Sequence, residues 1–134
     1  MATNSRIIQS MTEIIYKEES FKIIGLCMEV HNNLGKGFLE SVYKDALEYE
    51  FRKNNIPFER EKEYVVNYKD IILPHKFYAY FVVFDKIILE VKGMVGIAKE
   101  HIAQALNYLK VSGLKLGLIV NFGELSLQYK RVVF

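Results

Sequence analysis

Residues Ile87-Ile88-Leu89-Glu90-Val91-Lys92 form an apolar run that ends in a Glu-x-Lys. Because side chains alternate along a strand, Glu90 and Lys92 share one face and Val91 points to the other. A carboxylate and an ammonium at the end of a buried strand are costly, since charge resists leaving water. The pair is therefore typical of a site where a carboxylate holds a hard metal ion and a lysine lies beside a water or a phosphate oxygen, and we expect both side chains to face an open, hydrated groove.

The segments around this run predict an α/β protein. Apolar residues recur at helical spacing near residues 19–34, 38–53 and 97–112, and extended patterns cover 58–68, 71–73 with 77–84, 86–92, 115–121 and 126–133. The order α-α-β-β-β-α-β-β predicts a mixed β-sheet flanked by helices, in a single domain over 1–134. Residues 1–17 are expected to be a polar, partly extended N-terminal tail, with a short extended piece at residues 14–16. The strand at 115–121 is apolar almost throughout, which indicates a central position covered on both faces.

Composition sets broad limits on function. Of the 134 residues, 51% are hydrophobic and 25% are charged, as in a globular protein, and the formal net charge of +2 permits a nucleic-acid partner without requiring one. There is no apolar run of about 18 residues, so no membrane span is expected. The single cysteine, Cys27, lies in an apolar helix stripe and is expected in the core, and one cysteine suits a reducing compartment, so we expect a cytoplasmic protein. With widely spaced histidines, the chain has no zinc pattern.

A tyrosine stands where a second carboxylate would be expected. If residues 84–86 form a tight turn, position 80 lies opposite position 90 on one face of the hairpin. A divalent metal site would place an aspartate at position 80, but the chain has Tyr80. Asp85 cannot replace it, because five residues along an extended strand span about 16 Å. The alternative interpretation of Glu90 and Lys92 is an ion pair at the edge of the sheet.

The second helix offers another carboxylate in Gly37-Phe38-Leu39-Glu40-Ser41-Val42-Tyr43. At 100° per residue, Glu40 and Tyr43 lie within about 60° of each other on the helix. Glu40 borders the apolar stripe, so it could supply a second carboxylate to a metal at Glu90, or it could simply face solvent. Gly35-Lys36-Gly37 is interpreted as the end of one helix and the start of the next, since no strand and Gly-Lys-Ser/Thr accompany it.

The third helix carries a polar and aromatic stripe beside its apolar one. His101, Gln104 and Tyr108 recur at i, i+3 and i+7. Such a stripe can bind a phosphate or orient a carboxylate. Its alternative is a helix flank that packs on the sheet.

Taken together, these motifs resemble the GxxExxY family of the PD-(D/E)XK nuclease superfamily. Gly37, Glu40 and Tyr43 match the motif that names the family, Glu90 and Lys92 match the E-x-K of the nuclease signature, and Gln104 and Tyr108 match a Q-x-x-x-Y helix of related nucleases. The resemblance covers nearly all of 19–134. It implies a restriction-endonuclease-like core, magnesium (or manganese) as cofactor and hydrolysis of phosphodiester bonds in DNA or RNA.

The resemblance also implies roles for individual residues. Glu90 would bind the metal, Lys92 would assist the attacking water, and Glu40 would add or orient a ligand. Gln104 and Tyr108, with Tyr43 and His101 beside them, would position the substrate. Tyr80 stands at the position of the family's metal-binding aspartate. A phenol with a pKa near 10 is a poor magnesium ligand.

Three hypotheses follow from this pattern. The first is a metal-dependent nuclease, impaired by Tyr80. The second is an inactive nuclease-fold module that binds nucleic acid or another protein. The third is an oligomerising structural protein in which Glu90 and Lys92 form only a salt bridge. A homodimer could form through the terminal strand at 126–133, by edge-to-edge pairing.

Overall fold

The structure is a computed structural model that describes residues 14–134. Its elements follow the expected order. They are helices α2 (Lys17–Leu34) and α3 (Glu40–Lys53), strands β1 (Phe58–Tyr68), β2 (Ile71–Val83) and β3 (Ile87–Lys92), helix α4 (Lys99–Ser112), and strands β4 (Leu116–Asn121) and β5 (Gln128–Val133). The expected α/β architecture, a mixed sheet flanked by helices, is confirmed. The expected tail at 1–17 lies mostly outside the described residues.

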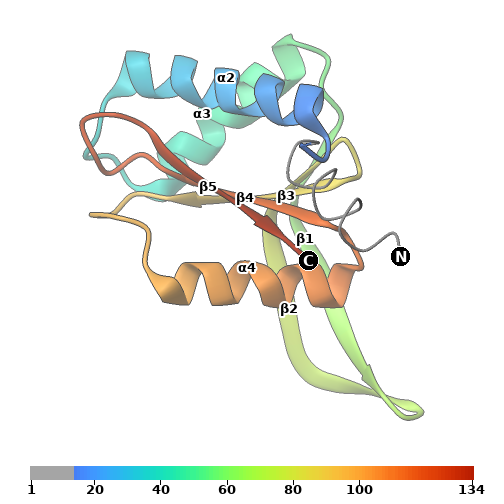
Figure 1. The fold of residues 1–134 in the computed structure, drawn as a ribbon. Coiled ribbons are helices and arrows are strands. Elements are labelled where there is room, and N and C mark those ends of the chain that lie inside the picture. Colours follow the sequence, from blue (N-terminus) through green and yellow to red (C-terminus); the bar gives the residue numbers. More distant parts are fainter. Residues whose placement is uncertain (1–13) are drawn as a thin grey trace, which may run out of the picture.

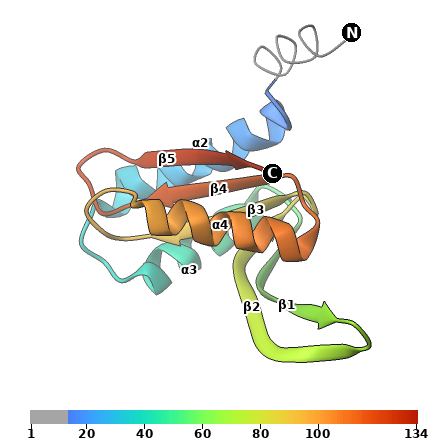
Figure 2. The same cartoon turned by 60° about the horizontal axis from the view of Figure 1, so that its bottom comes forward.

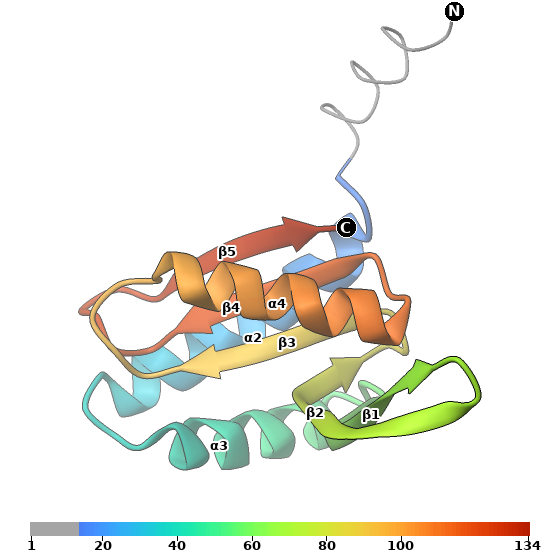
Figure 3. The ribbon, with the colours of Figure 1, turned by 90° about the horizontal axis from the view of Figure 1, so that it is seen from below.

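The five strands form one sheet in the order β1-β2-β3-β4-β5. Strands β3 and β4 are parallel, and every other neighbouring pair is antiparallel. Parallel neighbours need a crossover connection, and α4 supplies it. Figures 1 and 3 show α2 and α3 on one face of the sheet and α4 on the other.

The core has two parts, one on each face of the sheet. Leu89, Val91 and Leu118 pack with residues of α2 and α3, whereas Ile88 and Ile119 pack with Ala105, Tyr108 and Leu109 of α4. Every residue of β4 is buried, which confirms the predicted strand covered on both faces. Cys27 is fully buried, as expected, and burial raises the pKa of its thiol.

Glycines end two of the helices at the expected places. Gly35 follows α2 with φ 68°, and its N–H donates to the His31 carbonyl at 2.8 Å. Gly113 follows α4 in the left-handed conformation, with φ 74° and ψ 5°. Gly35 therefore ends α2 as predicted, whereas α3 begins at Glu40, three residues after Gly37.

Two local expectations differ from the structure. Residues 14–16 were expected to be extended, but Tyr16 has φ 52° and precedes the first residue of α2. The extended pieces at 71–73 and 77–84 form one continuous strand, with Pro74 inside it. Pro74 lies where the β1–β2 register shifts, between Val65 and Asn67, so its missing N–H breaks no regular ladder.

Strands β1 and β2 continue as a two-stranded ribbon beyond the sheet. Pairing of β2 with β3 spans only Val83↔Ile87 to Phe81↔Leu89, while β1 and β2 remain paired out to Tyr68↔Ile71. Figure 2 shows the ribbon bending away from the other three strands. The sheet therefore opens between β2 and β3 just after Phe81, which is where Glu90 and Tyr80 lie.

Candidate functional site

Glu90 is buried where β2 separates from β3. Its exposed fraction is 2%, so the carboxylate does not face the open, hydrated groove that the sequence suggested. By alternation it shares the face of Ile88, which α4 covers. Burial raises the pKa of Glu90 to about 7, although the Tyr80 N–H and the charge of Lys92 both act to lower it. Oε1 is buried and has no hydrogen-bond partner among the described residues.

Tyr80 meets Glu90 through its backbone. The β2–β3 pairing ends at Phe81↔Leu89, so positions 80 and 90 come next along the two strands but do not form a paired step of the ladder. Here the Tyr80 N–H donates to Oε2 of Glu90 at 3.3 Å. A side-chain carboxylate therefore takes the place that a backbone carbonyl would hold in a regular ladder.

The other end of Tyr80 meets Glu40, which is the first residue of α3. The tyrosine hydroxyl donates to Oε1 of Glu40 at 3.1 Å, and Oε2 of the same carboxylate accepts the Gly93 N–H at 3.1 Å. Burial, followed by the nearby charge of Glu40, raises the pKa of the Tyr80 phenol well above its usual value. The phenol therefore stays protonated at neutral pH and acts as a hydrogen-bond donor. Tyr80 thus joins the two carboxylates that the sequence proposed as metal ligands.

Two lysines surround the Tyr80 ring. Nζ of Lys44 lies 4.1 Å from the ring centroid, and Nζ of Lys92 lies 5.2 Å from it. Both distances suit cation–π attraction. No ion pair joins Lys92 to Glu90 within residues 14–134, so the structure does not support the alternative interpretation of the two residues as an ion pair at the edge of the sheet. We call Glu40, Tyr80, Glu90, Lys44 and Lys92 the tyrosine-centred site.

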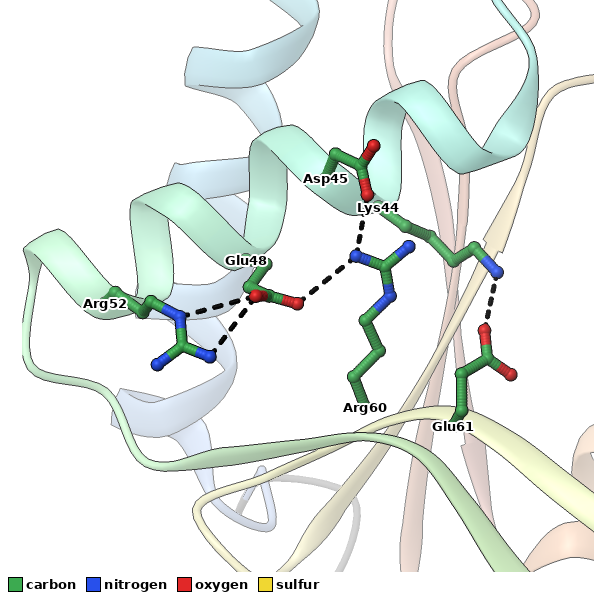
Figure 4. A network of polar contacts seen from close by, with 6 residues as sticks. All are labelled: Lys44, Asp45, Glu48, Arg52, Arg60 and Glu61. Atoms are coloured by element: carbon green, nitrogen blue, oxygen red, sulfur yellow. Dashed lines mark hydrogen bonds and ion pairs between the residues drawn. The ribbon is translucent and has the colours of Figure 1, made fainter.

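An ion-pair network fastens α3 to β1 beside this site. Figure 4 shows its members, which are Lys44, Asp45, Glu48 and Arg52 of α3 with Arg60 and Glu61 of β1. Lys44 binds Glu61 at 2.8 Å, and Arg60 binds both Asp45 at 2.7 Å and Glu48 at 3.2 Å. The Lys44 side chain is only 13% exposed, so its pairing resists solvent more than an ordinary surface pair.

The strand backbone is irregular at the same level. The β1–β2 ladder runs from Arg60↔Phe81 to Lys62↔Ala79 and skips the step at Glu61 and Tyr80. Glu61 has φ 56°, a left-handed conformation that is uncommon outside glycine. Such conformations persist where surrounding contacts hold them and cluster at functional sites.

The three residues of α4 that the sequence predicted as substrate contacts have different environments in the structure. Tyr108 is 6% exposed and packs edge-on against Phe77, and burial followed by the charge of Glu90 raises its pKa to about 12. His101 caps its own helix, since its Nδ1 accepts the Ala98 N–H at 2.9 Å. Gln104 is exposed. The structure thus brings Tyr108 near Glu90, whereas the Gln104 side chain is exposed to solvent.

Tyr43 holds the loop between α2 and α3. Its side chain is fully buried and stacks on Phe122 with ring centroids 4.4 Å apart. The hydroxyl donates to the Gly35 carbonyl at 2.6 Å and accepts the Phe38 N–H at 3.2 Å. These contacts give Tyr43 a positioning role for the loop that precedes Glu40.

The tyrosine-centred site does not fit a divalent metal ion. Within residues 14–134, no group of three or more His, Cys, Asp or Glu side chains is arranged to hold one. The two carboxylates bind opposite ends of Tyr80, its N–H and its hydroxyl. The ammonium groups of Lys44 and Lys92 also lie against the Tyr80 ring and already supply positive charge there. Hydrogen bonds from the chain therefore occupy three of the four oxygens of Glu40 and Glu90, and only Oε1 of Glu90 is left without a partner among the described residues.

Lys44 and Glu61 border the tyrosine-centred site but were not predicted from the sequence. A usable signal existed for Lys44, which follows Glu40 by four residues and so shares its helix face. Glu61 gave no such signal, because its position depends on a left-handed residue inside a strand pattern.

Comparisons with known proteins agree with this fold. A family model described as the PD-(D/E)XK nuclease superfamily matches residues 17–132. A solved structure titled "Crystal structure of SSO0001" is similar with a TM-score of 0.56 and 20% identity, over 69% of this chain and 48% of that chain. This chain thus spans about half the length of that protein, and the likeness supports the fold alone. No curated protein matches. No helix in the described part of the chain has the length and apolarity needed to cross a membrane.

Because the family model matches residues 17–132, the chain belongs to the PD-(D/E)XK nuclease superfamily.

Proposed function

We propose that this protein is a nuclease-fold module that binds nucleic acid, in which metal-dependent hydrolysis of phosphodiester bonds is silenced at Tyr80. The observation that carries the proposal is the position of the Tyr80 side chain, with its hydroxyl 3.1 Å from Glu40 and two ammonium groups at its ring. A tyrosine held in this way supplies neither the charge nor the open coordination position of a carboxylate. We place the protein within the GxxExxY family on the spacing of Gly37, Glu40 and Tyr43.

Nucleic acid is the proposed ligand because lysine ammonium groups attract phosphate oxygens without needing a metal. Lys92 supports this role, since it forms no ion pair within residues 14–134 and is the last residue of the buried strand β3. Tyr108 and Gln104 remain proposed contacts of the strand on the α4 side. DNA and RNA are both candidate ligands.

An active metal-dependent nuclease is the second candidate. The observation that favours it is Oε1 of Glu90, because a buried carboxylate oxygen without a partner is unusual and often marks a ligand position. A carboxyl group with its pKa raised to about 7 is also the kind of group found at functional sites.

Cleavage and binding assays separate these candidates. Supercoiled plasmid and labelled DNA and RNA oligonucleotides would be incubated with magnesium, manganese or EDTA, and binding would be followed by fluorescence anisotropy. We expect the unaltered protein to bind in all three conditions and to cleave in none. Tyr80→Asp is expected to gain metal binding in calorimetry, and Tyr80→Phe is the matched control that adds no carboxylate.

Cleavage by the unaltered protein that Glu90→Ala abolishes would establish the active nuclease instead. Failure to bind any of the DNA or RNA probes would remove the proposed function. A thermal melt of each variant checks that it is folded.

A further inference from the structure

A groove lies between α2 and the β5 edge of the sheet, which are neighbours in Figure 1. Its volume is about 200 Å³, and most of its lining surface is apolar. The apolar walls include Phe21, Ile24 and Met28 of α2 and Leu118 of β4. We call it the α2–β5 groove. None of the residues that line it belongs to the tyrosine-centred site.

The polar part of the groove is built around Arg131 of β5, a partly buried cation. Its guanidinium donates to Oγ of Ser20 at 2.8 Å and to the Ile15 carbonyl at 2.7 Å, and both acceptors are neutral. Burial lowers the pKa of Arg131, and among residues 14–134 only the Tyr129 phenol acts in the opposite direction. A buried charge is normally paired with an opposite one. Arg131 has therefore lost water without gaining a counter-charge from the described chain.

The other charges around the groove also favour an anion. Lys17 is the second cation of the lining, and it forms no ion pair in the part of the chain that the structure describes. The acidic residues of α2 lie outside the lining. Glu19 binds Lys86 at 2.9 Å, Glu29 accepts a hydrogen bond from the side chain one turn further along the helix, and Glu18 is exposed. Strands β4 and β5 contain no acidic residue. The lining thus has two cations and no carboxylate.

We infer that the α2–β5 groove binds a small organic anion, a carboxylate with an unbranched apolar chain of about six to eight carbons. An arginine has five N–H donors in a fixed fork, which matches a carboxylate, and Arg131 uses two of its nitrogens within the described residues. An apolar cavity of about 150 Å³ takes up benzene, so the larger groove suits about eight carbons. The chain lies against Phe21, Ile24 and Met28. The inference is independent of the proposed function.

A small anion suits the groove better than a second copy of the chain. A stable dimer needs a broad interface, whereas the groove is a narrow hollow beside one edge strand. Pairing of β5 with β5 of a second copy would also bring together two sets of Lys130 and Arg131. Like charges that lie opposite each other destabilise a sheet.

The test is calorimetry of the full chain with hexanoate, octanoate and 1-octanol, each below its micelle or solubility limit. We expect octanoate to bind about tenfold more tightly than hexanoate, because two further CH₂ groups are buried. It should also bind at least about tenfold more tightly than 1-octanol, which lacks the charge. In spectra of protein with ¹³C-labelled methionine methyl groups, octanoate should shift the signal of Met28, which lines the groove, and leave that of Met94, in the loop after β3, unchanged.

Two variants test the two parts of the groove. Arg131→Gln is expected to abolish the preference for octanoate over 1-octanol, and Arg52→Gln is its matched control, because Arg52 is an exposed arginine of α3 that pairs with Glu48. Gly25→Leu leaves Arg131 intact. Gly25 lines the groove, and no atom lies within 4 Å of a Cβ placed there, so the leucine narrows the groove without a clash. Its affinity for octanoate should fall at least about tenfold. Thermal melts check that each variant is folded.

Equal affinity for octanoate and 1-octanol, or a shift of Met94 in place of Met28, would overturn the inference. So would binding to anionic vesicles without binding of monomeric octanoate, which would assign the groove to a lipid surface. A dimer that Arg131→Gln dissociates would assign it to a second copy. Octanoate binding by Glu13→Gln but not by the unaltered protein would assign it to the residues that precede Ile14 in the same chain.

Discussion

The Tyr80 hydroxyl donates a hydrogen bond to the Glu40 carboxylate at 3.1 Å, across 40 residues of sequence. The bond joins the ribbon formed by β1 and β2 to the first turn of α3, and Glu40 extends the connection to Gly93. A single tyrosine therefore links the three segments that enclose the tyrosine-centred site.

Removing this hydroxyl is expected to destabilise the protein. Tyr80→Phe should lower the free energy of unfolding by about 1–2 kcal/mol, because a hydrogen bond to a charged acceptor is lost while the ring remains. Urea unfolding of Tyr80→Phe, Glu40→Gln and the double variant measures the coupling between the two groups. Strictly additive effects would show that the bond contributes nothing to stability.

The buried carboxyl of Glu90 makes stability depend on pH. Its pKa is raised from 4.5 to about 7, so the folded protein binds this proton more tightly than the unfolded chain. Stability from this group is therefore highest below pH 4.5, falls as the pH rises to about 7 and is level above that. The loss is roughly 3 kcal/mol, at about 1.4 kcal/mol per pKa unit. The difference in unfolding free energy between the unaltered protein and Glu90→Gln, measured from pH 4 to 8.5, isolates this term. A difference that does not change with pH would contradict it.

Nucleic-acid binding should not depend on divalent ions. We expect EDTA to leave the affinity unchanged, because Lys92, which forms no ion pair within residues 14–134, supplies positive charge at the site without a metal. Lys92→Gln should weaken binding and reduce the slope of log affinity against log salt by about 0.9 for duplex DNA. Anisotropy titrations between 50 and 200 mM salt, about the range over which such slopes are measured, provide the values. Lys110→Gln is the control, because Lys110 is an exposed lysine in the last turn of α4.

Tyr43 and Gln104 should behave in opposite ways. Tyr43→Phe removes two hydrogen bonds to the loop at Gly35 and Phe38 and is expected to cost about 1–2 kcal/mol of stability with little change in affinity. Gln104→Ala, at an exposed position, should leave stability within about 0.5 kcal/mol and lower affinity if the side chain contacts the strand. Melting and anisotropy of both variants decide the matter, and a loss of affinity in Tyr43→Phe alone would contradict the assignment.

Two glycines test the packing of the loops. Gly123→Ala places a Cβ 2.2 Å from the Met94 carbonyl oxygen and is expected to destabilise the protein by about 3 kcal/mol or more. Gly25→Ala meets no atom within 4 Å in the middle of α2 and should stabilise it by up to about 1 kcal/mol. Thermal unfolding of the pair is the measurement. Equal effects would mean that the close approach of the two loops does not exist in solution.

The sequence predicted the order of elements because period-two and helical patterns alternate clearly along the chain. It also predicted that positions 80 and 90 lie near each other across the hairpin, and the Tyr80 N–H does donate to the Glu90 carboxylate, although the strand pairing itself ends at Phe81↔Leu89. It did not predict that Glu90 would be buried, because the depth of a strand residue depends on the helix packed over it. Nor did it predict the contacts of Lys44 with Glu61 and Tyr80, which arise from an irregular step between β1 and β2.

The roles assigned to the α4 stripe show the same limit. Helical spacing placed His101, Gln104 and Tyr108 near one another on the helix, but spacing alone cannot distinguish a buried phenol, a self-capping imidazole and an exposed amide. Those differences come from Phe77 and the strands beneath, which the period of a single helix does not encode.

Glu90 accepts its hydrogen bond from the main chain of position 80 and not from the side chain there. Every amino acid except proline carries that N–H, so the join between β2 and β3 is indifferent to which residue occupies the position. A substitution of Tyr80 by an acidic residue would therefore keep the hydrogen bond between the backbone of β2 and the Glu90 side chain of β3. The side chain at position 80 can therefore change during evolution while the backbone contact between β2 and β3 is kept.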